Sequence, residues 1–138
     1  MMLIAWVGAF VHALALRGEY LRRVRKARRD PVLVARQRLN QRRHARQIAS
    51  EEPDLARELG IGRPDVRGAK AMGVVDVNHA SATAIAKLPE VDAELAEQIV
   101  TAREEIRGFA SPEDLGHVLD LDPSLVDRLR DRTVYLPR

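Results

Sequence analysis

Apolar side chains in the carboxy-terminal half of the chain recur at spacings of three and four residues, and the pattern itself repeats after thirty residues. Such spacings place apolar side chains on one face of an α-helix. A short turn interrupts each repeat once, so each repeat predicts two helices joined by a hairpin. Two such units can bury their apolar faces against each other. The pattern therefore predicts an all-α domain of two pseudo-repeats, with period thirty, over residues 74–138.

Helix start signals occur at matching places in the two repeats. Ser111 precedes a proline and two acidic residues, which is the order expected of a capping residue and a first helical turn. By the repeat, Ser81 begins the matching helix, with Asn78 and His79 as alternative caps. An aspartate begins the second helix of each repeat, at Asp92 and Asp122.

The amino-terminal run, residues 1–16 from Met1 to Leu16, contains only a glycine and a histidine besides apolar residues. As a helix it measures about 24 Å, slightly less than the ~30 Å hydrocarbon core of a bilayer. Continuation to residue 21 completes a span, so we expect residues 1–21 to be a membrane segment. A start inside a longer membrane region and a buried helix in a soluble protein are the alternatives. A secretory signal fits poorly, because no basic residue precedes the run.

A basic stretch, residues 17–50, follows the apolar run and is expected to be a juxtamembrane helical region. Positive charge beside a membrane helix holds its side in the cytoplasm. We therefore expect a single-pass or peripheral protein of the cell membrane, with a cytoplasmic carboxy-terminal domain. The stretch could also bind anionic lipid or nucleic-acid phosphates, or only set the topology. Its densest patch consists of Arg22, Arg23, Arg25, Lys26, Arg28 and Arg29.

Two further helix signals precede the repeats. Asp30 followed by Pro31 predicts a helix start, because aspartate caps a helix and proline is tolerated in its first turn. Residues 51–73 predict a short helix that ends near Leu59, followed by a linker rich in glycine.

The composition narrows the chemistry. The chain has no cysteine, and its four histidines lie far apart in the sequence, so no metal site is expected. No nucleophile motif or glycine-rich phosphate loop is present, and the carboxylates fall at caps and on exposed helix faces. We therefore expect no enzyme activity, no cofactor and no small-molecule substrate.

The net charge of +3 is unevenly divided. Residues 1–71 carry 16 basic and 7 acidic groups, a net of +9, whereas residues 72–138 carry 7 basic and 13 acidic groups, a net of −6. Such asymmetry indicates two parts with different partners.

Residues 74–136 resemble the tandem helix-hairpin-helix domain of the ComEA-type competence DNA receptors, and are similar to related modules of bacterial membrane proteins. In that family a hairpin built as Gly-apolar-Gly lets backbone N–H groups approach a DNA phosphate without reading bases. Independently of the resemblance, Gly108 is expected to end a helix between the repeats and Phe109 to anchor the core. The resemblance is carried by Asn78, Ala80, Ser81, Leu88, Pro89, Ala96, Ile99, Arg103, Gly108, Phe109 and Leu115.

The chain departs from that pattern in both hairpins, where an acidic residue replaces each glycine. The side chains add bulk and strain any turn residue that needs a positive φ. Carboxylates repel a phosphate, and an aspartate cap accepts the helix N–H groups that would hold the anion. We therefore expect the fold to be retained and the hold on DNA to be weakened. The two turns read Glu90, Val91, Asp92 and Asp120, Leu121, Asp122.

Two functions remain as hypotheses. The first is a noncatalytic, membrane-tethered interaction module that docks an unknown protein partner. The second is a sequence-independent DNA-binding protein in which the basic segment, residues 17–46, replaces the lost hairpin contacts. The candidate phosphate-binding cations of the carboxy-terminal half are Lys87, Arg103, Arg107, Arg128, Arg130 and Arg132.

Overall fold

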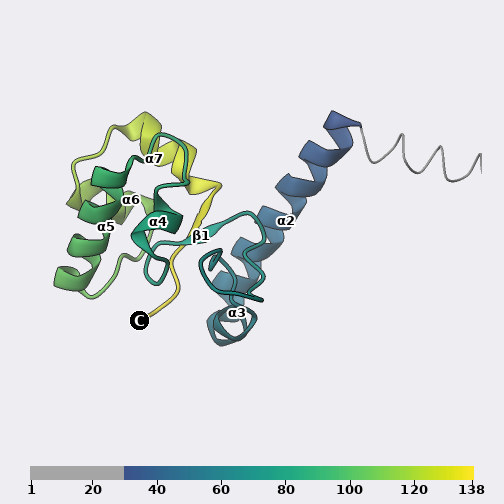
Figure 1. Cartoon of the computed structure of the whole chain (residues 1–138), viewed down its shortest axis with the longest axis horizontal. Coiled ribbons are helices and arrows are strands. Elements are labelled where there is room, and N and C mark those ends of the chain that lie inside the picture. The colour runs from purple at the N-terminus through teal and green to yellow at the C-terminus, as the bar shows by residue number, and fades with distance from the viewer. Residues whose placement is uncertain (1–29) are drawn as a thin grey trace, which may run out of the picture. The chain divides into compact units, whose positions relative to one another are not determined.

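The computed structural model describes residues 30–138 (Figure 1). The expected membrane segment and the patch of six cations in residues 22–29 lie outside the described residues. The chain divides into two units, Met1–Gln37 and Arg38–Arg138. Within residues 30–138, no helix combines the length and the apolar character that a membrane span requires.

The first helix before the repeats begins at the predicted start, and the second ends at the predicted residue. Helix α2 spans Pro31–Glu51, and the Asp30 carboxylate accepts a hydrogen bond from the Val32 N–H at 2.9 Å. Helix α3 spans Pro53–Leu59 and ends at Gly60, which adopts the left-handed conformation. Glycine takes this conformation without steric cost, so it ends the helix sharply.

The carboxy-terminal half contains two helical pairs, which confirms the all-α prediction. In each pair the two helices pack against one another. Ser81 and Ser111 cap the first helix of each pair and accept hydrogen bonds from the N–H groups of Ala84 and Asp114, each at 3.2 Å. The four helices are α4 (Ala82–Ile85), α5 (Ala93–Ile106), α6 (Pro112–Val118) and α7 (Pro123–Arg130).

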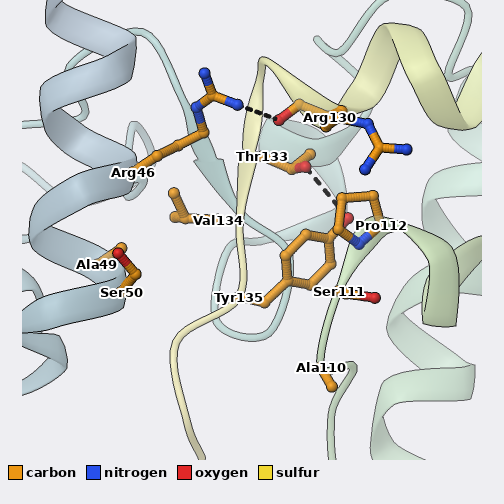
Figure 2. A pocket seen from close by; sticks show the side chains of 10 residues that line it. All are labelled: Arg46, Ala49, Ser50, Ala110, Ser111, Pro112, Arg130, Thr133, Val134 and Tyr135. Atoms are coloured by element: carbon orange, nitrogen blue, oxygen red, sulfur yellow. Dashed lines mark hydrogen bonds between the residues drawn. The ribbon is translucent and has the colours of Figure 1, made fainter.

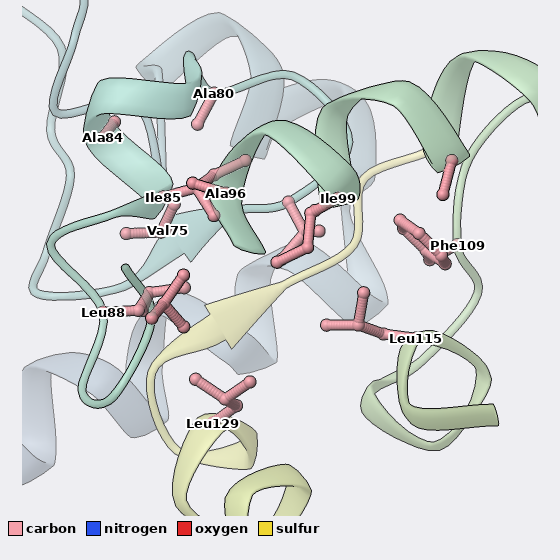
Figure 3. Close-up of a cluster of buried hydrophobic side chains, with 13 residues drawn as sticks. Val75, Ala80, Ala84, Ile85, Leu88, Ala96, Ile99, Phe109, Leu115 and Leu129 are labelled. Carbon is pink, nitrogen blue, oxygen red and sulfur yellow. The ribbon is translucent and has the colours of Figure 1, made fainter. Parts of the chain in front are cut away.

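One apolar core joins the two pairs (Figure 3). Ile85 and its repeat partner Leu115 are buried, and so are Ile99 and its partner Leu129. Each fully buried side chain of this size contributes roughly 1.5–3 kcal/mol relative to its exposed state. The largest departure from the repeat is Val118, which remains 39% exposed whereas its partner Leu88 is buried.

The two pairs also differ in the sizes of two side chains that meet between their helices. In the second pair, a Cβ on Gly116 would lie 2.5 Å from a Val126 methyl group, so only glycine fits there. In the first pair the equivalent positions are Ala86 and Ala96. The first pair thus has alanine at both positions, whereas the second pair has glycine at one and valine at the other.

A short parallel pair of strands, which the helical pattern did not predict, closes the domain. Strand β1 is Val75–Asp76 and strand β2 is Thr133–Val134, with Val75 opposite Thr133. Two-residue strands are too short to show the alternation that identifies a strand in sequence. Their pairing brings the start of the first repeat to the end of the second.

Residues 60–73 differ from the linker that their glycine content suggested. Ile61 is fully buried, and the Gly62 carbonyl accepts a hydrogen bond from the Asp76 N–H at 2.7 Å. A Cβ on Gly62 would lie 2.5 Å from that same nitrogen, so its glycine allows close packing. The compact unit that contains the repeats is Arg38–Arg138, and residues 60–73 pack within it. Its second apolar cluster contains Ala45, Ala56, Ile61, Val74, Val134 and Leu136.

The end of α5 also differs in detail from the expectation. Arg107 is the left-handed residue that ends the helix, with φ of 65°, and Gly108 follows with φ of 109°. A Cβ on Gly108 would approach the Asn78 side chain to 3.2 Å. Gly108 is therefore required by the contact with Asn78 as well as by its φ. Phe109 is buried in the core, as expected.

Candidate nucleic-acid interface

The two hairpin turns share a left-handed first residue. Glu90 has φ of 58° and Asp120 has φ of 51°, so the first acidic residue of each turn is left-handed. Asp92 and Asp122 have negative φ values and start the following helices. Glycine would therefore relieve strain only at the first position of each turn, where a residue with a side chain costs roughly 1–2 kcal/mol.

Both aspartates act as helix caps, which confirms the sequence prediction. The Asp92 carboxylate accepts a hydrogen bond from the Leu95 N–H at 2.8 Å. The Asp122 carboxylate accepts from the Ser124 N–H at 2.8 Å and from the Ser124 hydroxyl. These bonds hold the pKa of the Asp122 carboxyl below its usual range. The first N–H groups of α5 and α7 are thus partly satisfied by the chain's own carboxylates.

The central residues of the turns point into the protein. Val91 is buried and Leu121 is half-buried, and both pack in or against the main core. The Leu121 N–H donates to the Gly116 carbonyl at 2.9 Å, and the Val91 N–H donates to the Leu88 carbonyl at 3.3 Å. Both central N–H groups are therefore used within the protein.

Two of the exposed candidate cations are paired with carboxylates, and the buried Arg103 lies 3.6 Å from Glu104. Arg128 of α7 reaches Glu90 of the first turn at 2.7 Å, so it joins the two repeats across the hairpin surface. Arg130 pairs with Glu113 and with Asp127. The side chains of the Arg128 and Arg130 pairs are exposed, and exposed pairs contribute about 0–1 kcal/mol each. The pairs cancel local positive charge without fixing the structure strongly.

Arg103 is the candidate that the structure places inside the domain. Only 7% of the residue is exposed, and its Nη1 donates to the carbonyls of Val77 and Ala80 at 2.8 and 2.6 Å. Burial lowers the pKa of this guanidinium, whereas nearby Glu104 raises it. Arg103 therefore supports the segment before α4 and presents little surface to a phosphate.

The remaining three candidates lie at the surface. Lys87 and Arg107 are exposed, and Arg132 is half-buried just before β2. Within residues 30–138 none of the three takes part in an ion pair. The six cations do not form one strip, since they are buried, paired or separated.

A buried polar network that sequence reasoning missed fixes the two repeats to each other. The Asn78 amide donates to the carbonyls of Phe109 and Leu136 at 2.8 and 3.0 Å and accepts from the Phe109 N–H at 2.8 Å. Asp76 accepts from the N–H groups of Asn78 and Leu136, and lies 2.6 Å from the His79 Nδ1. Burial raises the pKa of Asp76, and His79 opposes that shift. Polar residues inside the apolar run VVDVNHA were the available signal.

A groove of about 310 Å³ lies beside β2, between the last turns of α2 and the start of α6 (Figure 2). Small and apolar side chains form most of its lining, including Ala49, Pro112 and Val134. Arg46 and Arg130 stand at its edge, and the Arg46 Nη1 donates to the Arg130 carbonyl at 3.4 Å. Among residues 30–138, no group of three or more metal-ligating side chains is arranged to hold an ion.

Comparison with known families identifies the class of motif. Residues 70–133 match the family model described as a helix-hairpin-helix motif. This match confirms the helix-hairpin-helix interpretation of the carboxy-terminal half, and it suggests a nucleic-acid-binding module of a kind that is typically noncatalytic. It does not distinguish the ComEA-type receptors from other proteins with the motif. Neither a curated protein nor a solved structure matches the chain significantly.

Proposed function

We propose that residues 38–138 form a noncatalytic module that binds nucleic-acid phosphates without reading bases, and that its hairpin turns hold phosphate only weakly. The observation that carries this proposal is the hairpin geometry. In both turns a carboxylate occupies the left-handed position and a second carboxylate caps the next helix. The helix-hairpin-helix motif suggests that the ligand is nucleic acid. The carboxylates of the turns support a weak hold on its phosphates.

Electrostatics and hydrogen bonding both favour a weak hold at the turns. A carboxylate about 4 Å from a phosphate is repelled by ~1 kcal/mol even in water, and each turn brings two carboxylates. The anion site that a helix N-terminus would offer is used by the Asp92 and Asp122 side chains. The scaffold is intact, because the core packs through both repeats.

Fluorescence anisotropy with a labelled random-sequence DNA duplex tests the role of the turns. We expect E90G/D120G to bind DNA several-fold more tightly than the unsubstituted chain, because two carboxylates are lost and the turn backbone becomes accessible. The matched control is E90Q/D120N, which removes the same charge but keeps the side chains. Equal tightening in both variants would assign the effect to charge alone.

The proposal has a clear contrary outcome. If the unsubstituted chain binds DNA tightly and both glycine substitutions leave the affinity unchanged, the turns are not weakened phosphate sites. If no variant binds DNA at low salt, the module does not bind nucleic acid.

A second candidate function is a membrane-tethered interaction module that docks a protein partner. The sequence observation that favours it is the apolar run at residues 1–16, followed at once by basic residues. A carbonate-resistant membrane fraction of the full chain, lost when residues 1–16 are deleted, is the expected result. Recovery of the full chain in the soluble fraction would reject tethering. A cytoplasmic carboxy-terminal domain would be protected from protease in sealed right-side-out vesicles.

A further inference from the structure

Helix α2 lies against the segment that leads from α7 into β2. The Arg46 Nη1 contacts the Asp131 carboxylate at 3.0 Å and the Arg130 carbonyl at 3.4 Å. Ala45, on the same side of α2, is fully buried in the cluster that includes Val134. These contacts fix the register of α2 along the second repeat.

One turn earlier on α2, Arg42 lies over the start of β1. A Cβ on Gly73 would be 3.4 Å from the Arg42 Nε and 3.5 Å from its Cγ, so the side chain crosses this glycine closely. The Arg132 carbonyl accepts a hydrogen bond from the Val75 N–H at 2.8 Å, which places Arg132 beside the same strand start. Arg42 and Arg132, ninety residues apart in the sequence, are therefore neighbours.

These arginines form a like-charged group with little compensation. Arg38 lies one further turn along α2, on the same face as Arg42 and Arg46. Four arginines, Arg38, Arg42, Arg46 and Arg132, share one carboxylate, Asp131, for a net charge of +3, and Arg46 already pairs with that carboxylate.

Arg42 is the centre of this group. Burial lowers the pKa of its guanidinium, Arg132 and Arg38 lower it further, and Asp131 opposes them. Its Nε is buried and has no hydrogen-bond partner among the described residues. No ion pair within residues 30–138 involves Arg38, Arg42 or Arg132. A bound polyanion would supply the missing counter-charge.

We infer that Arg38, Arg42 and Arg132, here called the arginine surface, hold the phosphates of the nucleic acid in place of the hairpin turns. This inference rests on the proposed function. Guanidinium groups match phosphate oxygens with paired N–H donors. Arg38 and Arg42 lie about 6 Å apart along the helix axis, a spacing that lets them reach neighbouring phosphates of one strand.

Two observations favour nucleic acid over a lipid headgroup as the polyanion. The arginine surface belongs to the same compact unit as the two hairpins, and Arg132 lies inside the stretch that matches the helix-hairpin-helix model. Residues 70–133 suggest a nucleic-acid partner, and nothing in that motif suggests a lipid.

The test measures binding of a labelled random-sequence duplex to the full chain over a range of salt concentrations. We compare R38Q/R42Q/R132Q with R43Q/R67Q/K70Q, a control that removes the same charge at three exposed positions, one of them on α2. The first variant is expected to bind about a hundredfold more weakly at ~0.1 M salt, with a salt slope reduced by about 2.7. The control is expected to change affinity less than about threefold and to retain the slope.

Different failures have different meanings. No binding by the unsubstituted chain would reject the proposed function. If both variants weaken binding equally, or if neither does, the role of the arginine surface is rejected and the proposed function is not. Vesicles of phosphatidylserine and phosphatidylcholine form a second arm, and loss of vesicle binding with unchanged DNA binding would assign the arginines to lipid.

A folding control keeps the result interpretable. R38Q changes one exposed residue, and R38K/R42K/R132K keeps the charge while removing the guanidinium fork. If R38Q/R42Q/R132Q unfolds at a lower temperature than the unsubstituted chain, binding by R38Q and by the lysine variant tests the inference instead. Weaker binding by R38Q, with binding by the lysine variant largely retained, supports the inference. Unchanged binding by R38Q overturns it, whereas an equally large loss in a folded lysine variant shows that the guanidinium fork is needed.

Discussion

The hairpin turns and the arginine surface differ in backbone geometry and in charge. The first residue of each turn is left-handed, but carboxylates flank both turns and their central N–H groups donate within the protein. The arginine surface has uncompensated positive charge, and its residues lie on α2 and in the turn between α7 and β2. The comparison shows that the helix-hairpin-helix scaffold and the uncompensated positive charge lie in different parts of the same compact unit.

Removal of α2 and α3 should cause the largest loss of stability. A fragment of residues 74–138 keeps both hairpins but loses Ala45, Ala56 and Ile61, which cover Val134 and other apolar residues. Uncovering several buried side chains, at roughly 1.5–3 kcal/mol each, should remove most of a stability of about 5–15 kcal/mol. Thermal unfolding followed by circular dichroism should show a cooperative transition for residues 38–138 and a weak one for residues 74–138. Equal transitions would mean that the repeats fold alone.

Asn78→Ala should have the next largest effect, because it separates the two hairpins from each other. The substitution leaves the Phe109 N–H and the carbonyls of Phe109 and Leu136 without partners in a buried site. We expect a loss of about 3 kcal/mol in the free energy of unfolding, measured by urea denaturation. Gln98→Ala, on the exposed side of α5, is the control and should change stability by less than ~0.5 kcal/mol. A similar small change for Asn78→Ala would contradict the role given to the network.

Glu90→Gly should change stability by a smaller amount, through the first hairpin turn. Glycine relieves the left-handed strain but removes the exposed ion pair with Arg128. Measured in an Arg128→Gln background, where the pair is already absent, it should stabilise the chain by up to about 1 kcal/mol. Asp120→Gly should gain less, because aspartate tolerates the left-handed region better than glutamate. Urea unfolding of the unsubstituted chain, Asp120→Gly, Arg128→Gln and Glu90→Gly/Arg128→Gln measures these differences. Destabilisation by Glu90→Gly in the Arg128→Gln background would show that the turn is unstrained.

Asp65 should give an effect of similarly small size that depends on pH. Its carboxylate pairs with Arg63 at 3.0 Å and accepts from the Ser81 N–H at 3.2 Å, so it joins the segment after α3 to the cap of α4. The Arg63 hydrogen bond lowers the pKa of Asp65. A lowered pKa contributes stability above the unfolded value, and this contribution is lost as pH falls through the folded value. Asp65→Asn should therefore cost about 1 kcal/mol at neutral pH and nothing well below pH ~3.9. A constant difference between pH 7 and pH 3 in thermal unfolding would contradict this assignment.

Local signals in the sequence were sufficient for the helices and hairpins. Ser111, Asp92 and Asp122 cap the helices that the sequence assigned to them, because a capping bond involves residues only two or three positions apart. The thirty-residue period identified both repeats, since equivalent core positions such as Ile99 and Leu129 face the same interior.

Contacts between distant residues were beyond the same reasoning. Arg103 resembles an exposed helical cation in sequence, but its partners are the carbonyls of Val77 and Ala80 on another segment. The proximity of Arg42 and Arg132 depends on how α2 packs against β2, and no periodicity records that packing. Periodicity indicates which face of an element is buried, and it leaves open which other element covers that face.

The pairing of β1 with β2 also sets the order in which the chain can reach its native state. Val75 meets Thr133, and Leu136 is buried beside them, so these contacts join residues almost sixty positions apart. Local helices form in microseconds or faster, whereas contacts of long sequence separation must await loop closure. During synthesis the ribosome must therefore release residues 133–136 before the domain can close, although every helix of both repeats has already emerged.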